Sequence, residues 1–170
     1  MLISASVDKT DRSHDMVTHP WALVICPADH DRTTGAMKTI VRVTAAIIVR
    51  DGRILIAQRH PGDRLAGRWE FPGGKVESGE TPEQCLKREL LEELDMHAVI
   101  GDCLGSSIYH DDHISIELMA YRAFWNGDSF RLVSHQACQW VTPDQLAGFA
   151  FTPADLPFVK RLAGGIIDLR

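Results

Sequence analysis

Apolar residues follow regular patterns from Met37 onward, whereas residues 1–36 mix His, Asp, Thr and Pro without sustained periodicity. The run MKTIVRVTAAIIVRDGRILIAQRH has a β-branched stretch on either side of Asp51-Gly52, a dipeptide suited to a tight hairpin turn. This pattern predicts a pair of strands. AVIGDCLGSSIYH and HISIELMAYRAFW predict a second pair around Asp111-Asp112, and ACQWV predicts one more short strand.

Helical signals begin at Thr81-Pro82-Glu83-Gln84. Thr81 can cap a helix, Pro82 suits its first position, and Gln84 completes a capping box. Leucine then recurs every four residues, at Leu86, Leu90 and Leu94, which predicts one apolar stripe on the helix. TPDQLAG and PADLPFVKRLAG are predicted to be two further helices, because each has a proline near its start.

The composition fits one globular domain with a hydrophobic core, since 45% of the 170 residues are hydrophobic. The longest apolar runs are far shorter than the roughly 20 residues of a membrane helix, and the N-terminal sequence does not resemble a secretory signal. We therefore expect a cytoplasmic protein that does not associate with membranes. Residues 37–170 form the predicted domain, and residues 1–36 are either a loosely packed extension or precede the true start at Met37.

Charge and cysteine spacing exclude several classes of function. The net charge of −5 disfavours a broad nucleic-acid-binding surface, which needs clustered Lys and Arg. The four cysteines include no CxxC pair, which argues against a zinc site. A small polyanion that binds together with a metal cation remains compatible with this composition.

Three glutamates crowd together on the first predicted helix. Glu89, Glu92 and Glu93 have the spacing i, i+3 and i+4, so they form a stripe beside the leucines, and like charges at this spacing repel one another. Arg88 can pair with Glu92 but cannot neutralise all three. A solvated acidic helix is one interpretation; the other is a site for a hard divalent cation such as Mg²⁺, which prefers oxygen ligands and phosphate. Gly73 and Gly74 allow their backbone to approach such a site closely.

The wider spacing favours the metal site. Gly74, Glu80, Arg88-Glu89-Leu90, Glu92-Glu93 and Asp95-Met96 stand at the intervals of the Nudix box, Gx5Ex7REUxEExGU with U aliphatic. Asp95 is the one departure, because the family has Gly there as a left-handed helix cap. Asp visits that conformation less readily, so we expect a modest cost in stability and intact chemistry.

From Met37 to about Leu162 the chain resembles the MutT branch of the Nudix hydrolases, and more specifically its CTP pyrophosphohydrolase-like members. VTAAIIVRDGRILIAQR, GRWEFPGGKVESGETPEQ, WVTPDQL and PADLPF carry this resemblance. It implies an α/β fold, an α/β/α sandwich around a mixed sheet. It also implies hydrolysis of a nucleoside triphosphate to the monophosphate and pyrophosphate with Mg²⁺, for which Mn²⁺ substitutes.

The resemblance assigns roles to individual residues. Glu92, Glu93 and the Gly73 carbonyl are expected to hold the metal, and Glu89 to bind a further ion or act as the base, so that Glu89, Glu92 and Glu93 are the catalytic candidates. Gly74, Glu80 and Arg88 are expected to support the box structurally. The expected substrate contacts are Arg59, Arg64, Glu70, Phe71, Pro72, Gly73, Gly74, Lys75 and Asp155. Trp69 is expected in the core rather than stacked on a base.

Asp155 bears on which base is bound. Relatives that read 8-oxoguanine carry Asn at this place, whereas an ionised Asp only accepts hydrogen bonds and suits the amine of cytosine. The alternative role for Asp155 is interaction with a helix N-terminus. Two departures from the family affect the substrate and the metal. Ser134 and His135 stand where many relatives have a loop glutamate, and Tyr109 falls near an expected basic contact.

The leading prediction is an enzyme that cleaves cytidine nucleotides (CTP, dCTP or 5-methyl-dCTP) or oxidised nucleotides, in sanitation of the nucleotide pool and DNA repair. The alternatives are an 8-oxo-dGTP diphosphatase of MutT type, a nucleoside-diphosphate-sugar or ADP-ribose hydrolase, and a Nudix-fold module that binds a nucleotide without cleaving it. The expected partner is the nucleotide alone, without stable nucleic-acid binding, in a monomer or a homodimer.

Overall fold

The structure is a computed structural model that describes residues 40–110, 112 and 114–167. The predicted extension, residues 1–36, lies outside the described residues, as does Met37. The strands are β1 (Ile40–Arg50), β2 (Arg53–Arg59), β3 (Trp69–Glu70), β4 (Val99–His110), β5 (Ser115–Phe124) and β6 (His135–Val141). The helices are α1 (Pro82–Leu94), the 3-10 helix η1 (Pro143–Gly148) and α2 (Leu156–Ala163).

The strands form one mixed sheet in the order β3-β2-β1-β5-β4, and β6 pairs with β2. β1 and β5 are parallel, and the other pairs are antiparallel. The predicted hairpin is present, with Asp51 and Gly52 both at positive φ. The second predicted pair is β4 and β5, and ACQWV lies within β6. The expected mixed sheet of an α/β fold is thus confirmed.

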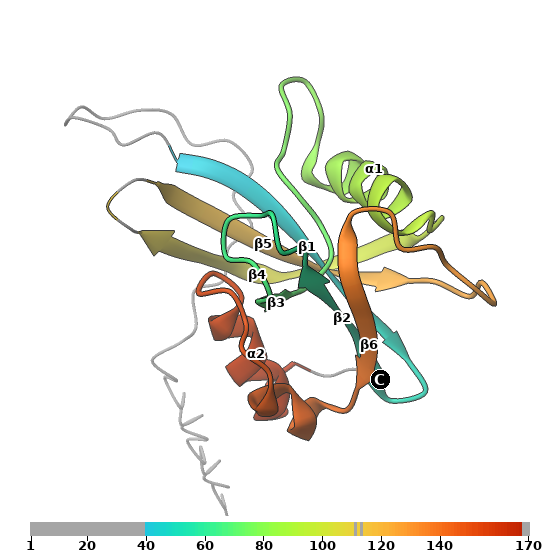
Figure 1. Cartoon of the computed structure of the whole chain (residues 1–170). Helices are drawn as coiled ribbons and strands as arrows, with labels where there is room; N and C mark the ends of the chain where they lie inside the picture. Colours follow the sequence, from blue (N-terminus) through green and yellow to red (C-terminus); the bar gives the residue numbers. More distant parts are fainter. Residues whose placement is uncertain (1–39, 111, 113, 168–170) are drawn as a thin grey trace, which may run out of the picture.

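Two hydrophobic clusters cover the two faces of this sheet. Successive residues point to opposite faces, so Ile54 and Ile56 belong to one cluster and Leu55 to the other. The first cluster includes Phe158 and Leu162 of α2, and the second includes the leucine stripe of α1. Figure 1 shows α1 and α2 on opposite sides of the sheet, which gives the α/β/α sandwich.

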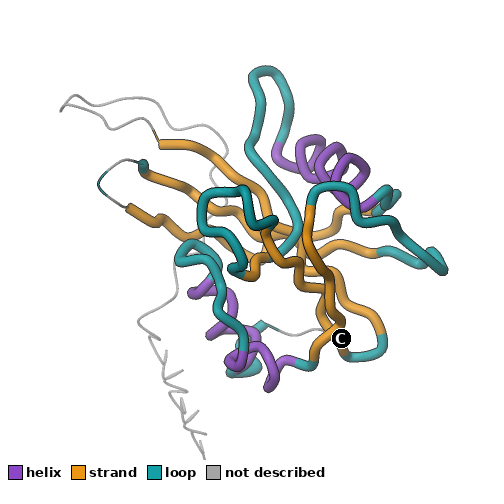
Figure 2. Tube along the Cα trace, in the orientation of Figure 1, coloured by secondary structure: helices purple, strands orange, loops and turns teal. Residues whose placement is uncertain are grey.

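Trp69 packs against the cluster on the α2 face, as expected for a core residue. Its ring meets the Phe149 ring edge-on, with 5.1 Å between the ring centroids. Figure 2 shows the two loops that flank β3: residues 60–68, which lead into it, and residues 71–81, which run beside α1 before that helix begins. Among the described residues, no helix is both long and apolar enough to cross a membrane.

Candidate active site on helix α1 and the adjoining cavity

Helix α1 begins and ends where the sequence predicts. The Thr81 N–H donates to the Gln84 side chain over 2.8 Å, and the Gln84 N–H donates to the Thr81 hydroxyl over 3.2 Å, which is the complete capping box. At the other end Asp95 adopts the left-handed conformation, with φ 53° and ψ 41°. These two caps fix the phase of the helix, so the leucines point into the core while the glutamates face the loop 71–81.

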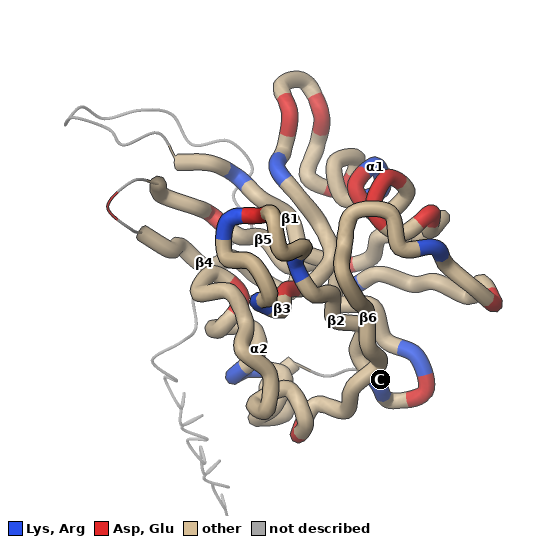
Figure 3. The backbone as a smooth tube through the Cα atoms, viewed as in Figure 1, with Lys and Arg blue, Asp and Glu red and all other residues tan. Residues whose placement is uncertain are grey.

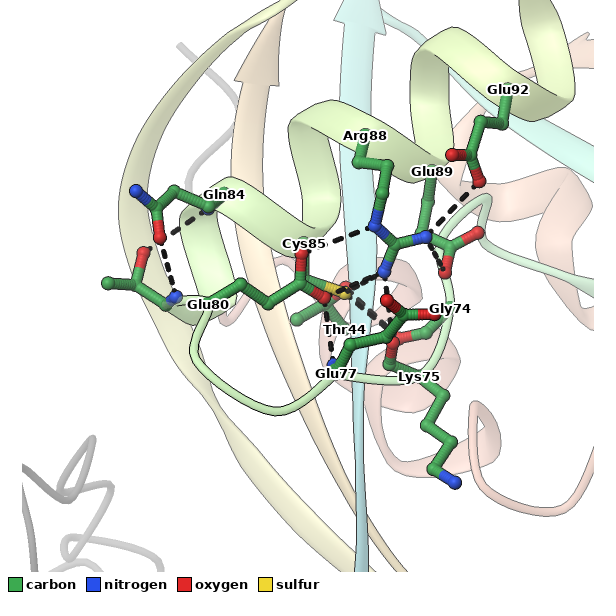
Figure 4. Close-up of polar contacts among 11 residues, drawn as sticks. Thr44, Gly74, Lys75, Glu77, Glu80, Gln84, Cys85, Arg88, Glu89 and Glu92 are labelled. Carbon is green, nitrogen blue, oxygen red and sulfur yellow. Dashed lines mark hydrogen bonds and ion pairs between the residues drawn. The ribbon is translucent and has the colours of Figure 1, made fainter.

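Arg88 is the centre of the charge cluster on α1. Its guanidinium donates to Glu80 over 2.7 Å, to Glu89 over 2.9 Å and to Glu92 over 3.2 Å, and it also reaches the Lys75 carbonyl. Figure 3 shows Asp and Glu positions gathered on this helix, and Figure 4 shows the guanidinium between the three carboxylates. Hydrogen bonding from Arg88 lowers the pKa of Glu80 to about 2. Arg88 therefore holds several box carboxylates at once, and not Glu92 alone.

The other two glutamates of the stripe lie against the glycine turn. The Gly73 N–H donates to Glu93 over 3.3 Å, and the Glu89 carboxylate occupies the space where a side chain on Gly74 would lie. Gly73, with φ 150°, packs its α-carbon so closely against β1 that a Cβ would come within 2.2 Å of the Thr44 carbonyl oxygen. Glycine at both positions is therefore a requirement of close packing.

The backbone of the turn leaves one carbonyl directed away from β1. The Pro72 carbonyl accepts from the Ala46 N–H over 2.7 Å, and the Gly74 carbonyl accepts from the Thr44 N–H over 2.8 Å. Carbonyls alternate in direction along an extended chain, so the intervening Gly73 carbonyl points to the other side. The N–H of the same residue donates to the Glu93 carboxylate.

The oxygen donors of Gly73, Glu89, Glu92 and Glu93 suit a hard divalent cation such as Mg²⁺ or Mn²⁺. Among the described residues, however, no three His, Cys, Asp or Glu side chains are gathered closely enough to hold a metal. Arg88 engages Glu89 and Glu92, so those two carboxylates must turn toward the Gly73 carbonyl to share a cation with Glu93. The donor chemistry of these four groups fits a divalent ion.

Glu93 lies in a buried and acidic environment. Burial, together with the nearby negative charges of Glu70 and Glu89, raises its pKa to about 7, although His135 acts in the opposite direction. A buried carboxylate beside other acids is stabilised by a cation.

A cavity of about 260 Å³ adjoins the glycine turn. Its polar lining includes Lys75 and Arg59 as well as Thr152 and Asp155. Its apolar wall is formed by Val43, Leu65, Tyr109, Ile116 and Leu118. Of the predicted substrate contacts, Arg59, Glu70, Phe71, Gly73, Gly74, Lys75 and Asp155 line this cavity. Pro72 and Arg64 do not: the Pro72 carbonyl bonds to β1, and the Arg64 carbonyl accepts from Arg59 over 2.7 Å.

Asp155 is almost completely buried, with 4% of its surface exposed. One carboxylate oxygen accepts from the Phe71 N–H over 3.2 Å and the other from the Thr152 hydroxyl. Although Asp155 is the N-cap residue of α2, its side chain makes no capping hydrogen bond. Burial raises its pKa to about 7, so the Asp155 carboxyl is partly protonated at neutral pH. This modifies the expectation that the side chain acts only as an acceptor.

His135 joins this site although sequence reasoning assigned the histidines no special role. Its side chain is 3% exposed, and its Nε2 lies 3.1 Å from one oxygen of Glu70. The other Glu70 oxygen lies 2.8 Å from Arg59. Burial lowers the pKa of His135, but Glu70 and Glu93 outweigh that effect and raise it overall. One sequence signal could have indicated a role for His135. It stands in the short segment before Trp140, where many relatives of the family have a loop glutamate.

Comparisons with known proteins identify the family of this chain. A model of the NUDIX domain matches residues 39–162. The CTP pyrophosphohydrolase of Escherichia coli (strain K12) is 39% identical over 125 residues, 71% of this chain and 90% of the relative. A putative 8-oxo-dGTP diphosphatase 2 of Mycobacterium tuberculosis (strain H37Rv) is 41% identical over 124 residues, 71% of this chain and 86% of the relative. The solution structure of the E. coli ORF135 protein superposes with a TM-score of 0.70 and 37% identity, covering 81% of this chain and 98% of that one.

Proposed function

Because the chain belongs to the Nudix hydrolase family, we propose that it hydrolyses nucleoside triphosphates to the monophosphate and pyrophosphate, with cytidine nucleotides as its preferred substrates. One observation carries this proposal. One cavity is lined both by the glycine turn, Lys75 and Arg59, which suit phosphates, and by the buried Asp155. We assign the first group to the triphosphate, as the charged end of the site, and Asp155 to the nucleobase, as its base-binding end.

The residues at the charged end divide the work of phosphoanhydride cleavage. Arg59 and Lys75 offset the negative charge of the phosphates. Glu89, Glu92, Glu93 and the Gly73 carbonyl would hold Mg²⁺, and a bound divalent ion would neutralise the phosphate oxygens and favour ionisation of water. Arg88 and Glu80 keep the box carboxylates in place when no cation does so. The general base that accepts the proton of the attacking water is one of the three glutamates Glu89, Glu92 and Glu93.

We assign selection of the nucleobase to the part of the cavity at Asp155. The Asp155 carboxylate accepts hydrogen bonds when ionised, which suits the exocyclic amine of cytosine. The E. coli relative named a CTP pyrophosphohydrolase supports this choice. These considerations place (d)CTP and 5-methyl-dCTP first among the proposed substrates.

One observation favours a second candidate, 8-oxo-dGTP. With a pKa of about 7, Asp155 is partly protonated near neutral pH, and a protonated carboxyl donates as well as accepts, as the amide of Asn does. The M. tuberculosis relative carries the name of an 8-oxo-dGTP diphosphatase. Cleavage of a modified nucleotide such as 8-oxo-dGTP or 5-methyl-dCTP would serve sanitation of the nucleotide pool.

The deciding experiment is a panel of canonical, methylated and oxidised (d)NTPs incubated with the protein and Mg²⁺, with products separated by ion-exchange chromatography. We expect (d)CMP and pyrophosphate to form fastest from (d)CTP. Reactions with EDTA, and reactions with ADP-ribose and sugar nucleotides, serve as controls. If no triphosphate releases pyrophosphate, the proposed function is wrong; if 8-oxo-dGTP is cleaved fastest, the second candidate replaces the first.

A further inference from the structure

His135 occupies a place in the site that the strand pairing creates. β6 pairs with β2, and a register shift between Gln58 and Arg59 brings His135 opposite Arg59, while Ala137 lies opposite Gln58. Gln136 is therefore the extra residue of a β-bulge, a feature that re-aims the side chains beside it. On the other side of β2, Glu70 pairs with Ala57, two residues before Arg59, so its side chain emerges on the same face as that of Arg59.

The three side chains form a linear chain of contacts. His135 Nε2 lies 3.1 Å from Glu70 Oε1, and Arg59 donates to Glu70 Oε2 over 2.8 Å. Because a carboxylate oxygen only accepts, Nε2 carries the proton. Both oxygens of Glu70 are thereby engaged, one by each neighbour. Arg59 is held at a second point by its Nε, which donates to the Arg64 carbonyl over 2.7 Å.

His135 is buried next to two acidic side chains. His135 is buried, with 3% of its side chain exposed, and Glu93 acts electrostatically on both it and Glu70. Without His135, one Glu70 oxygen would lose its partner beside another acid, and both burial and repulsion would favour rotation of that carboxylate. Rotation would remove the Glu70 contact of the Arg59 guanidinium, which lines the cavity. Among the described residues, that guanidinium would then be held only by the Arg64 carbonyl and by Asp63 at 3.8 Å.

We infer that His135 is a positioning residue for substrate binding: it fixes Glu70, and through Glu70 it holds the Arg59 guanidinium ready for the polyphosphate. This inference rests on the proposed function, because it assigns Arg59 to the phosphates of the substrate. It explains how a chain with Ser134 and His135 in place of a loop carboxylate still uses that segment. A preorganised guanidinium binds phosphate without first being ordered.

The test measures the affinity of the full chain for α,β-imido-dCTP with Mg²⁺ by titration calorimetry, because this analogue resists cleavage at the α,β bridge. His135→Leu removes the donor at similar size and is expected to weaken binding about tenfold, the loss of one charge-assisted hydrogen bond. His135→Gln places an amide N–H near Nε2 and should bind within about threefold of the wild type. Gln136→Ala, at the exposed neighbouring position, is the matched control and should bind as the wild type does.

A double-mutant cycle separates positioning from general damage to the fold. Arg59→Ala should weaken binding strongly in the wild type and by about tenfold less in His135→Leu, because the part of the Arg59 contribution that depends on His135 is already lost there. Full additivity of the two losses, or wild-type affinity in His135→Leu, would overturn the inference. Should His135→Leu not fold, His135→Asn replaces it, since its shorter amide does not reach Glu70 and should give the same loss.

The outcomes distinguish failure of this inference from failure of the proposed function. If the wild type cleaves (d)NTPs but His135→Leu binds the analogue normally, the inference fails and the function stands. If no triphosphate is cleaved while the analogue binds and the cycle shows coupling, the function fails and the positioning role stands. A wild type that neither cleaves triphosphates nor binds the analogue contradicts both.

Discussion

At the scale of single residues, Asp155 and Glu93 share one physical property. Both are carboxylates whose burial raises the pKa to about 7, far above the ordinary range of such groups. Asp155 lines the cavity and Glu93 contacts its glycine turn, and perturbed groups at a cavity are typical of functional sites. A cation would compensate Glu93, whereas the Phe71 N–H and the Thr152 hydroxyl already contact Asp155.

Asp155→Asn should change how stability depends on pH. The folded-state pKa of about 7 lies above the ordinary 3.8, so the folded protein keeps a proton that the unfolded chain releases between these values. The free energy of unfolding of the wild type therefore falls as pH rises through this window, and the neutral amide removes that contribution. Urea unfolding at pH 4.5 and pH 8 should show the variant gaining on the order of 3 kcal/mol relative to the wild type.

The same variant tests base recognition. We expect Asp155→Asn to cleave (d)CTP less well relative to 8-oxo-dGTP, because the amide both donates and accepts. An unchanged base ranking would remove Asp155 from the base-binding end, and a constant stability difference across pH would contradict its burial as an acid.

Glu93→Gln should abolish most turnover while the fold persists. Its amide replaces a buried carboxylate, which removes a costly charge and also a hard anionic ligand. We expect pyrophosphate release to fall by more than about a hundredfold, and Mg²⁺ to raise the melting temperature of the wild type but not of the variant. Glu77→Gln, at an exposed position of the neighbouring loop, is the control. Near-normal activity in Glu93→Gln would contradict the metal role.

Motif spacing in the sequence predicted most of the candidate site residues, but it did not predict contacts between residues from different elements. Spacing indicates that Glu89, Glu92 and Glu93 share one face of a helix, and the structure agrees. It does not indicate that Arg88 bonds to three carboxylates at once, because Glu80 comes from the preceding loop. The position of His135 before Trp140 did not reveal its contact with Glu70, because the two residues are 65 apart in the chain.

At the scale of elements, local signals predicted helices best where they were most complete. The capping box and the leucine repeat defined α1 correctly, and the left-handed Asp95 was expected from its place in the box. TPDQLAG has the same kind of start, with Thr142 and Gln145 reciprocally bonded, but it forms only the short 3-10 helix η1. A capping box fixes where a helix begins, and the length of the apolar pattern that follows decides how far it continues.

Asp95→Gly should stabilise the protein. Glycine adopts the left-handed conformation without steric cost, and the change also removes an acid from the negative end of α1. The lost contact with Arg131, at 3.7 Å between exposed side chains, is worth little. We expect a gain of about 0.5–1 kcal/mol in urea unfolding with unchanged activity. Asp95→Asn, which also tolerates this conformation, should give part of the gain; a loss of stability in both would refute the assignment of the cap.

The two glycines of the turn should respond differently to alanine. In Gly74→Ala the new methyl group would meet the Glu89 carboxyl carbon at 2.3 Å, so that flexible side chain must move. We expect at least about a tenfold loss of activity with little change in stability. In Gly73→Ala the methyl would meet the Thr44 carbonyl oxygen at 2.2 Å, and φ is 150°. That variant should lose more than about 2 kcal/mol of stability.

Circular-dichroism melting measures the stability of Gly73→Ala and Gly74→Ala, and pyrophosphate release measures the activity of the same two preparations. Gly52→Ala, in the hairpin turn where a Cβ meets nothing within 4 Å, controls for the strain of a positive φ alone. Equal losses of stability at Gly73 and Gly74 would contradict the distinction between backbone and side-chain contact.

At the scale of the whole molecule, the order of strands could not be read from the sequence. Two hairpins were predicted from turn signals and alternation, but the parallel pairing of β1 with β5 links segments about 75 residues apart. Such pairing depends on which faces are buried together, and no local pattern records it. The resemblance to a known family supplied this level, because it implied the mixed sheet that the structure has.

The last prediction concerns the extent of the domain. The described sheet begins at Ile40, and the match to the NUDIX domain begins at residue 39. We therefore propose that residues 37–170 are sufficient for folding and hydrolysis, and that a chain starting at Met37 melts within about 2 °C of the full-length protein with similar kcat/KM. A chain starting at Thr44 is the control. It lacks Ile40 to Val43, which pair with Ser115 to Leu118 of β5, and it should lose the cooperative transition. If the chain starting at Met37 melts as poorly as this control, residues 1–36 contribute to the domain and the proposed boundary is wrong.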